Sequence, residues 1–433
     1  MTLSKYCKIY PSEKSVRNVI LYSTKDAAIA EMPKAMAENI TDKRLSKEDR
    51  KTLKKMGFLI NDLLKERKEV LRFIDELNEL NRSLNIKLVM NLDCNLACRY
   101  CFEGMRKGQF YMTKQTADDF IRFVKNTVRR KGVFKELLIT FYGGEPLLSR
   151  ELIVYISQKL KLFAEEQGIR LKTYFVTNGT LLTKETVKLL KPLGLKEAQV
   201  TIDGPRPIHD TFRPYKTGRG SFDTIIKNVK DVRGMINICL GGNYSRNNFR
   251  LFPKHLAHLV RNGLGPGRIK SVQFSPIAQE RPDFGPADFN DGCTSINEPW
   301  LIEAFIHLRQ EILKSGFRFA KTSPGLCMME HENNLVVNYD GSIYKCPGLI
   351  GREEFSIGDI WTGTRDYHKS HNLDNWKNEE CLDCAYLPLC FGGCRYMKFV
   401  RDGNMDGVDC RKSYYEAALE TLVKQDIKYG LTA

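Results

Sequence analysis

The stretch 90–104, MNLDCNLACRYCFEG, places Cys94, Cys98 and Cys101 in one short loop directly after an apolar segment. A structural zinc ion normally takes four protein ligands, and no further cysteine or histidine lies close to this loop in the sequence. A four-iron, four-sulfur cluster held by only three thiolates leaves one iron open to another ligand. The spacing therefore predicts that the three cysteines hold a catalytic cluster with an open position.

The composition is that of a soluble globular protein of two or three domains. The chain has 433 residues, 42% hydrophobic and 28% charged, with no long apolar run and no signal-peptide pattern. We therefore expect a cytoplasmic protein without a membrane segment. The net charge of +16 is spread along the chain without a basic–aromatic stripe. This pattern favours a lysine-rich surface or an acidic polypeptide partner, and no nucleic acid is expected.

The thirteen cysteines are numerous and clustered. In a reducing compartment such clusters are better explained as metal ligands than as disulfides. Ten of them fall into two groups, within 94–101 and within 327–410. Cys7, Cys239 and Cys293 stand apart and are expected to be ordinary buried thiols.

After the N-terminal part, apolar strand candidates alternate with segments of helical periodicity such as 113–130. Six β–α repeats with short loops predict a parallel sheet, closed partly or fully into a barrel, over 83–276. In such barrels the chemistry gathers at the C-terminal ends of the strands. A linker and a bridging helix are expected in 277–326, followed by a cysteine-rich region and a C-terminal helix in 327–433. The expected strands are 86–92, 136–142, 171–177, 197–202, 235–241 and 269–275.

Residues 1–82 read as a unit of their own. Ser46 followed by Asp49 is an N-terminal capping signature for a helix. Strands, helices and a wing-like strand in so short a segment predict a winged-helix-like fold, with a helical lid as the alternative that the pattern leaves open. The expected strands are 5–10, 18–23 and 58–62, and the expected helices are 25–39, 46–57 and 66–80.

Polar motifs follow the later strands. The sequence GGEP at 143–146 comes after the second strand; its glycines allow close backbone approach to a ligand, and the Glu145 carboxylate can receive an ammonium group. Asn178 in VTNGT (176–180) ends the third strand. TIDGPRPIHDTFRPYKTGRGSF (201–222) follows the fourth.

With Tyr100 and Phe102 flanking Cys101, the cysteine loop resembles the signature of the radical SAM superfamily. The resemblance implies a partial (β/α)6 radical SAM barrel and a 4Fe–4S cluster whose open iron binds S-adenosylmethionine (AdoMet). It also implies that an electron from this cluster cleaves AdoMet to a 5′-deoxyadenosyl radical, which takes hydrogen from a substrate. The AdoMet contacts that the resemblance implies are Tyr100, Gly143, Gly144, Glu145, Asn178, Asp203, Arg213 and Ser221, with His209 and Asp210 in the same segment.

The C-terminal cysteines, with Gly341 five residues before Cys346 and CxxC-x5-CxxxC spacing over 381–394, resemble a SPASM domain. Zinc ribbons also use CxxC pairs, so this spacing alone leaves zinc as an alternative. The resemblance implies two auxiliary 4Fe–4S clusters, one fully ligated and one a ligand short. The first is assigned to Cys381, Cys384, Cys390 and Cys410, and the second to Cys327, Cys346 and Cys394.

Three functions fit these motifs: a maturase that crosslinks a ribosomally made (RiPP) precursor peptide, an anaerobic sulfatase-maturating enzyme that forms formylglycine, and a non-catalytic iron–sulfur or zinc scaffold. A scaffold gives no reason for polar motifs at successive strand ends. Sulfatase-maturating enzymes typically carry an aspartate base at the position of Pro347, and proline cannot accept a proton. The peptide maturase is therefore the preferred prediction.

The N-terminal unit resembles a leader-recognition element, which implies a precursor peptide with a leader as partner, paired with a strand edge near 18–23. An electron donor such as flavodoxin or ferredoxin is also implied. No cysteine lies between Cys327 and Cys346, so Cys239, Cys293 or His331 would have to complete that cluster. Alternatively its open iron takes a substrate thiolate, and a thioether crosslink is then expected.

Overall fold

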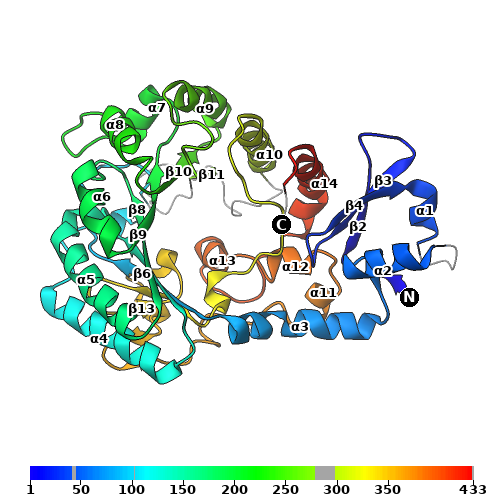
Figure 1. Ribbon diagram of the computed structural model, residues 1–433, viewed down its shortest axis with the longest axis horizontal. Coiled ribbons are helices and arrows are strands. Elements are labelled where there is room, and N and C mark those ends of the chain that lie inside the picture. The colour runs from blue at the N-terminus through cyan, green and yellow to red at the C-terminus, as the bar shows by residue number, and fades with distance from the viewer. Residues whose placement is uncertain (41–44, 102, 278–297, 432–433) are drawn as a thin grey trace.

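The chain folds into three regions that lie side by side along the long axis of the molecule (Figure 1). The computed structural model describes residues 1–40, 45–101, 103–277 and 298–431. The barrel strands and their helices occupy one end, the N-terminal unit the other, and the cysteine-rich C-terminal region lies between them. Across the described ranges, no helix combines the length and apolar character needed to cross a bilayer.

Six parallel strands, adjacent in sequence order from β6 to β11, form the main sheet and confirm the α/β prediction. Alternate residues of each strand enter the core: in β7, Leu137, Ile139 and Phe141 are buried and join one cluster with Phe120 and Ile153 of the covering helices. The strands are β6 (Ser83–Val89), β7 (Glu136–Tyr142), β8 (Arg170–Thr177), β9 (Leu195–Thr201), β10 (Asn237–Tyr244) and β11 (Ser271–Pro276). The helices are α4 (Lys114–Lys131), α5 (Arg150–Glu166), α6 (Lys184–Leu190), α7 (Arg206–Phe212), α8 (Phe222–Val232) and α9 (Phe252–Arg261).

The C-terminal region extends this sheet, which the sequence did not predict. Strand β12 (Asn334–Val337) pairs in parallel with β6, and β13 (Ile343–Tyr344) pairs antiparallel with β12. The segment between Cys327 and Cys346 is therefore anchored to the strand that precedes the Cys94 loop. The barrel and the C-terminal cysteines are held in one continuous sheet.

The N-terminal unit contains a three-stranded antiparallel sheet in the order β2-β3-β4. The prediction of a helix over 25–39 is wrong in its first part, because Ile29–Pro33 forms β4 and only Lys34–Glu38 is helical. Pairing with β3 and burial of Met32 outweigh the local helix propensity. The predicted cap is confirmed, since Ser46 Oγ accepts a hydrogen bond from the Asp49 N–H. The elements are β1 (Thr2–Leu3), β2 (Cys7–Pro11), β3 (Asn18–Ser23), β4 (Ile29–Pro33), α1 (Lys34–Glu38), α2 (Lys47–Lys55), β5 (Leu59–Ile60) and α3 (Leu63–Leu80).

Strand β3, near which an edge for the leader was expected, is the central strand of this sheet. It is hydrogen-bonded on one side to β2 and on the other to β4. The backbone groups of β3 are therefore already paired, and the edges belong to β2 and β4. An edge near 18–23, as expected, would therefore be that of β2 or β4 and not that of 18–23 itself.

Two long helices connect the regions. Arg309 of α10 is buried, forms an ion pair with Asp426 of α14, and donates to Gln425 Oε1 at 2.8 Å. Leu419 of α14 packs in one cluster with Ile20 of β3, so the C-terminal helix covers the N-terminal sheet (Figure 1). The remaining elements are α10 (Pro299–Lys314), β14 (Gly358–Asp359), β15 (Gly363–Thr364), α11 (Glu379–Leu382), α12 (Leu387–Cys390), α13 (Arg395–Asp402) and α14 (Lys412–Lys428).

Candidate active site

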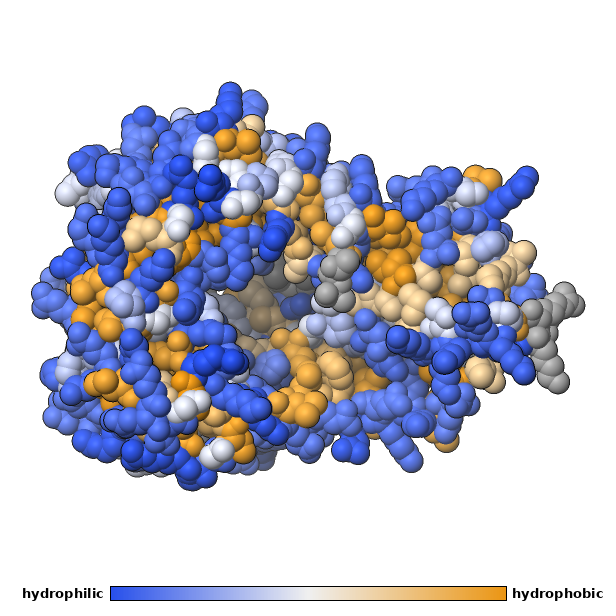
Figure 2. All heavy atoms as spheres, in the orientation of Figure 1, coloured by the Kyte–Doolittle hydropathy of each residue, from blue (hydrophilic) through white to orange (hydrophobic). Residues whose placement is uncertain are grey.

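A cavity of about 380 Å³ lies at the C-terminal ends of the parallel strands. Cys94, Cys98 and Cys101 all line it, because the loop that carries them folds over the end of β6. Figure 2 shows the face of the molecule hollowed between the barrel and the C-terminal region. Residues at the ends of five strands complete its wall: Tyr142, Thr177, Thr201, Asn243 and Pro276.

Cys94 is buried in this cavity, and Cys98 and Cys101 are partly exposed. Burial raises the pKa of Cys94 to about 11 and also raises the pKa of Cys98. Lys107 lies beside all three; burial lowers its pKa, but the three thiol groups together raise it above its ordinary value. Because metal binding needs thiolates, ligation here would release protons, and the ammonium of Lys107 would stabilise the thiolates before the metal is bound.

Three thiols lining one cavity are a donor set that fits a 4Fe–4S cluster with one iron left open. Among the residues that the structure describes, no three His, Cys, Asp or Glu side chains converge as a mononuclear metal site requires. The three thiols stand around the cavity wall instead, with Arg213 also lining it. Arg213 Nε is buried and has no hydrogen-bond partner within the described chain, so this N–H can serve a ligand.

The GGEP turn packs directly against the cysteine loop. The Gly144 N–H donates to the Asn91 carbonyl at 3.1 Å, and the Glu145 N–H donates to the Asp93 carbonyl at 2.8 Å. A Cβ on Gly144 would lie 2.1 Å from the Asp93 oxygen, and one on Gly143 would lie 2.3 Å from the Asn91 oxygen. The glycines were expected to allow approach of a ligand; in the structure they allow approach of the backbone that carries Cys94.

Glu145 does not line the cavity, although its sequence motif predicts a ligand contact. Its buried carboxylate accepts hydrogen bonds from the Leu147 N–H, the Thr177 hydroxyl and the Asn178 N–H at 2.8 to 3.1 Å. These bonds fix the turn after β8. As a result, Asn178 lines the cavity, and its Nδ2 lies 3.6 Å from the Cys94 sulfur.

Several polar side chains surround the buried guanidinium of Arg213. Arg213 Nη1 donates to the Tyr100 hydroxyl at 2.7 Å and lies 3.9 Å from Asp203 Oδ2. The Tyr100 hydroxyl in turn donates to Asp203, and the Asn243 N–H donates to the same carboxylate at 2.7 Å. Tyr100, Arg213 and Asn243 line the cavity, whereas Asp203 lies behind them and balances the charge of Arg213.

Ser221 also lies behind the cavity. Its hydroxyl donates to the Arg213 carbonyl at 2.7 Å and contacts His209 Nε2 at 3.0 Å. His209 Nδ1 accepts from the Asp203 N–H, and burial lowers the pKa of His209 to about 2, so the imidazole is neutral. Ser221 therefore holds the backbone of Arg213, and His209 holds the backbone of Asp203.

Several cavity residues were missed by the sequence analysis. Glu103 is 5% exposed, lines the cavity, and has a buried Oε1 without a partner in the described chain; burial raises its pKa to about 7. Its position two residues after Cys101 is the feature of the sequence that could have predicted its place in the cavity. Gly348 and Tyr396, from the C-terminal region, also line the cavity, and no pattern in the sequence shows that they meet the barrel. Phe102 lies outside the described residues.

Several C-terminal thiols lie close enough to one another to shift each other's pKa. Burial and the neighbouring Cys327 and Cys394 raise the pKa of Cys346 to about 12. Burial raises the pKa of Cys390 to about 12 as well, with contributions from neighbouring cysteines. Cys381 also lies beside Cys410 and Cys384.

Of the three candidates for a fourth ligand in the Cys346 group, Cys239 lies elsewhere. It is on β10, where it interacts with Ser271 and Glu197 of the adjacent strands, and four further strands separate β10 from β12. Cys293 lies outside the described residues. His331 lies in the same segment as Cys327, and burial lowers its pKa.

Comparison with known proteins identifies the family. Residues 88–244 match the family described as the Radical SAM superfamily. The serine-type anaerobic sulfatase-maturating enzyme of Bacteroides thetaiotaomicron is 24% identical over 75% of this chain and 85% of its own. The radical SAM cyclopropyl synthase TigE of Paramaledivibacter caminithermalis is 22% identical over 86% of this chain and 81% of its own.

Solved structures share the fold. The structure of anSMEcpe with bound AdoMet matches with a TM-score of 0.60 at 19% identity, covering 80% of this chain and 97% of that chain. Streptococcus suis SuiB bound to S-adenosylmethionine matches with a TM-score of 0.52 at 15% identity, covering 95% and 100%. With the cysteine loop at the strand ends, these findings show that residues 88–244 form a radical SAM domain in an enzyme of the peptide-maturase type, and this domain implies a 4Fe–4S cluster and AdoMet.

Proposed function

We propose that this enzyme installs a crosslink in a ribosomally synthesised precursor peptide, and that the crosslink is a thioether made by a cysteine of that peptide. Two similar solved structures support a peptide substrate, and the first is anSMEcpe with bound AdoMet and Kp18Cys peptide. The second is SuiB, which has been solved bound to the precursor peptide SuiA. The substrate would enter the cavity between the barrel and the C-terminal region.

Cys94, Cys98 and Cys101 would hold the cluster that serves AdoMet. When bound, the cluster and AdoMet supply a 5′-deoxyadenosyl radical that takes a hydrogen atom from the substrate. The side chains of this enzyme would bind and orient AdoMet. The buried Arg213 presents a permanent positive charge and an Nε–H without a hydrogen-bond partner in the described chain, and both suit the carboxylate of AdoMet. Tyr100 and Asp203 hold this guanidinium in place.

The remaining AdoMet contacts divide into two kinds. Gly143, Gly144 and Asn178 line the cavity and are proposed to touch AdoMet directly. Glu145 and Ser221 are proposed to act as positioning residues, since their hydrogen bonds hold the backbone of Asn178 after β8 and the backbone of Arg213.

One observation carries the thioether proposal. Gly348 and Tyr396 line the same cavity as the three barrel cysteines, and they follow Cys346 and Cys394 by two residues each. A substrate cysteine bound at the proposed cluster of Cys327, Cys346 and Cys394 would therefore lie at the wall of the cavity in which the hydrogen atom is removed. Holding both reacting groups in one cavity is what crosslinking requires.

We propose two auxiliary 4Fe–4S clusters. Their proposed ligands are Cys381, Cys384, Cys390 and Cys410 for one, and Cys327, Cys346 and Cys394 for the other. The grouping of the thiols supports this assignment. Reduced thiols require a reducing compartment such as the cytoplasm, and a one-electron donor such as flavodoxin or ferredoxin is needed.

Formylglycine formation in a sulfatase is the second candidate, favoured by the similarity to sulfatase-maturating enzymes. Pro347 argues against it. This residue begins the turn Pro347–Leu349 next to Cys346, at the position where those enzymes typically carry an aspartate base, and its side chain cannot accept a proton. The N-terminal unit is instead proposed to bind the leader, along the edge of β2 or β4.

Mass spectrometry after anaerobic turnover tests the function. The substrates would be the short peptide encoded beside this chain's gene and, separately, a cysteine-containing sulfatase peptide. The expected product is the first peptide, lighter by two hydrogens, with its cysteine no longer alkylatable. Cys346→Ala should abolish this product, whereas Cys239→Ala, which removes a thiol on β10, should not. A product with a free cysteine, or formylglycine in the sulfatase peptide, would contradict the proposal.

A further inference from the structure

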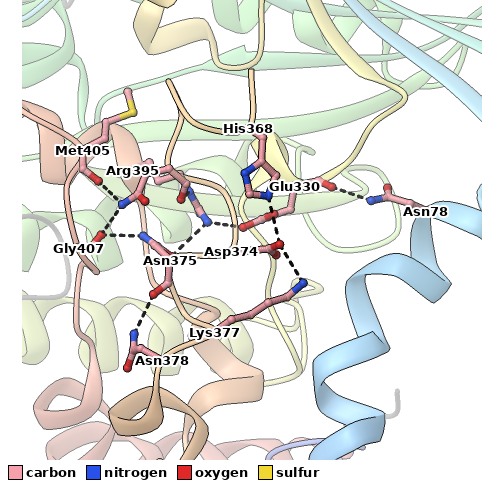
Figure 3. Close-up of polar contacts among 11 residues, drawn as sticks. Asn78, Glu330, His368, Asp374, Asn375, Lys377, Asn378, Arg395, Met405 and Gly407 are labelled. Carbon is pink, nitrogen blue, oxygen red and sulfur yellow. Dashed lines mark hydrogen bonds and ion pairs between the residues drawn. The ribbon is translucent and has the colours of Figure 1, made fainter. Parts of the chain in front are cut away.

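The buried ion pair between Glu330 and Arg395 lies at the centre of a polar network in the C-terminal region (Figure 3). The two side chains are 3% and 1% exposed. Arg395 directly follows Cys394 at the start of α13. Glu330 ends a short turn that begins at Cys327, since its N–H donates to the Cys327 carbonyl at 3.0 Å. The ion pair therefore joins the two segments that carry Cys327 and Cys394.

The same network reaches the other group of thiols. Arg395 Nη2 donates to Asn375 Oδ1 at 3.3 Å, and Asn378 Nδ2 donates to the Asn375 carbonyl at 2.8 Å. Asn378 Oδ1 accepts from the Cys381 N–H at 2.9 Å and so caps α11, the helix that carries Cys381. A continuous chain of contacts thus connects the segments that hold both groups.

Asn78 connects this network to α3 (Figure 3). Its Nδ2 donates to the Glu330 carbonyl at 2.8 Å, and its Oδ1 accepts from the Glu332 N–H at 3.1 Å. The oxygen and the nitrogen of the Asn78 side-chain amide therefore both bind the backbone that follows the Cys327 turn. No apolar side chain of similar size could make either bond.

The apolar face of α3 packs against the same region. Val70 and Ile74 are buried in one cluster with Trp376 and Phe391, and Phe73 stacks on Phe391 with 5.4 Å between ring centroids. In Figure 1, α3 runs from the N-terminal unit along the cysteine-rich region to the barrel. The helix is thus part of the support of the C-terminal region as well as part of the N-terminal unit.

We propose that α3 is a positioning element for the C-terminal thiol groups, and that Asn78 is a positioning residue for the group of Cys327, Cys346 and Cys394. This inference rests on the ligation proposed above. Side chains that orient metal ligands from behind commonly affect metal affinity by about 10- to 100-fold when removed. The N-terminal unit would then be needed for cluster integrity as well as for peptide binding, so point variants of the full chain are the appropriate test.

The experiment measures iron in full-length, anaerobically reconstituted protein and its release to a chelator. Wild-type protein should hold about twelve irons per chain, four for each cluster. Asn78→Ala should release about four of them roughly tenfold faster than wild type. Asn78→Asp, which keeps an acceptor for the Glu332 N–H, should release them at an intermediate rate. Asp75→Ala, at an exposed position of the same helix, is the matched control and should behave as wild type.

Two outcomes would overturn the positioning role alone. One is iron release from Asn78→Ala at the wild-type rate; the other is loss of all clusters together, which indicates general unfolding and can be checked by circular dichroism. A wild-type protein with only about four irons would overturn the proposed ligation itself. Failure of the peptide product with normal iron content would contradict only the proposed function.

Discussion

Gly144→Ala tests whether the GGEP turn supports the cysteine loop. The new Cβ would lie 2.1 Å from the Asp93 carbonyl oxygen and 2.6 Å from its carbon. Real Cβ contacts essentially never fall under 3.0 Å, so a displacement of about 1 Å is required. Both clashing atoms belong to the backbone next to Cys94, and backbone cannot rotate away as a flexible side chain can.

The expected cost follows from these contacts. Overpacking of a close-packed site costs about 1–3 kcal/mol, and loss of the hydrogen bond from the Glu145 N–H to the Asp93 carbonyl, 2.8 Å long, adds about 1 kcal/mol. The lower entropy of the unfolded chain with alanine returns about 0.4–1 kcal/mol. We expect Gly144→Ala to lower the free energy of unfolding by about 2–3 kcal/mol and to displace the Cys94 thiol.

Two measurements check this expectation. Urea unfolding of the iron-free protein, followed by circular dichroism, gives the free energy of unfolding, and iron analysis after reconstitution reports the barrel cluster. Gly234→Ala is the control, because a Cβ there meets no atom within 4 Å and should change stability by less than about 0.5 kcal/mol. A Gly144→Ala protein as stable as this control, with its iron complete, would refute the steric reasoning.

Two further predictions concern the cluster and the core. Cys98→Ala should abolish formation of 5′-deoxyadenosine by reduced, reconstituted protein, because two thiolates cannot hold the site; continued release of 5′-deoxyadenosine would contradict the assignment of the loop. Burial lowers the pKa of His255 to about 3, so between pH 6.5 and about 3 the unfolded chain binds a proton that the folded chain does not. Stability should therefore fall as the pH drops, by about 1.4 kcal/mol per unit from this group. Between pH 6.5 and pH 5, the free energy of unfolding measured in urea should fall by about 2 kcal/mol less for His255→Gln than for wild type. Equal decreases for the two proteins would show that His255 is protonated in the folded protein.

Local patterns were sufficient for the barrel strands. The segment 136–142 was predicted with the bounds that β7 has, because alternation of apolar residues and short loops are properties of neighbouring residues. The cap at Ser46 was predictable for the same reason. Pairing decided what local propensity could not: 29–33 became a strand against β3, and β3 itself became the central strand.

The sequence by itself determined the chemistry that the site can carry: three thiols in one loop, a GGEP turn after the second strand, and a second set of closely spaced cysteines near the C-terminus. Only the tertiary structure decided which residues reach the cavity. Glu145 lies behind it because Thr177 and the Asn178 backbone satisfy its carboxylate. Gly348 and Tyr396 line it because β12 pairs with β6 and brings the C-terminal region to the barrel. A strand pairing between residues some 250 positions apart depends on long-range packing, and no local pattern records it.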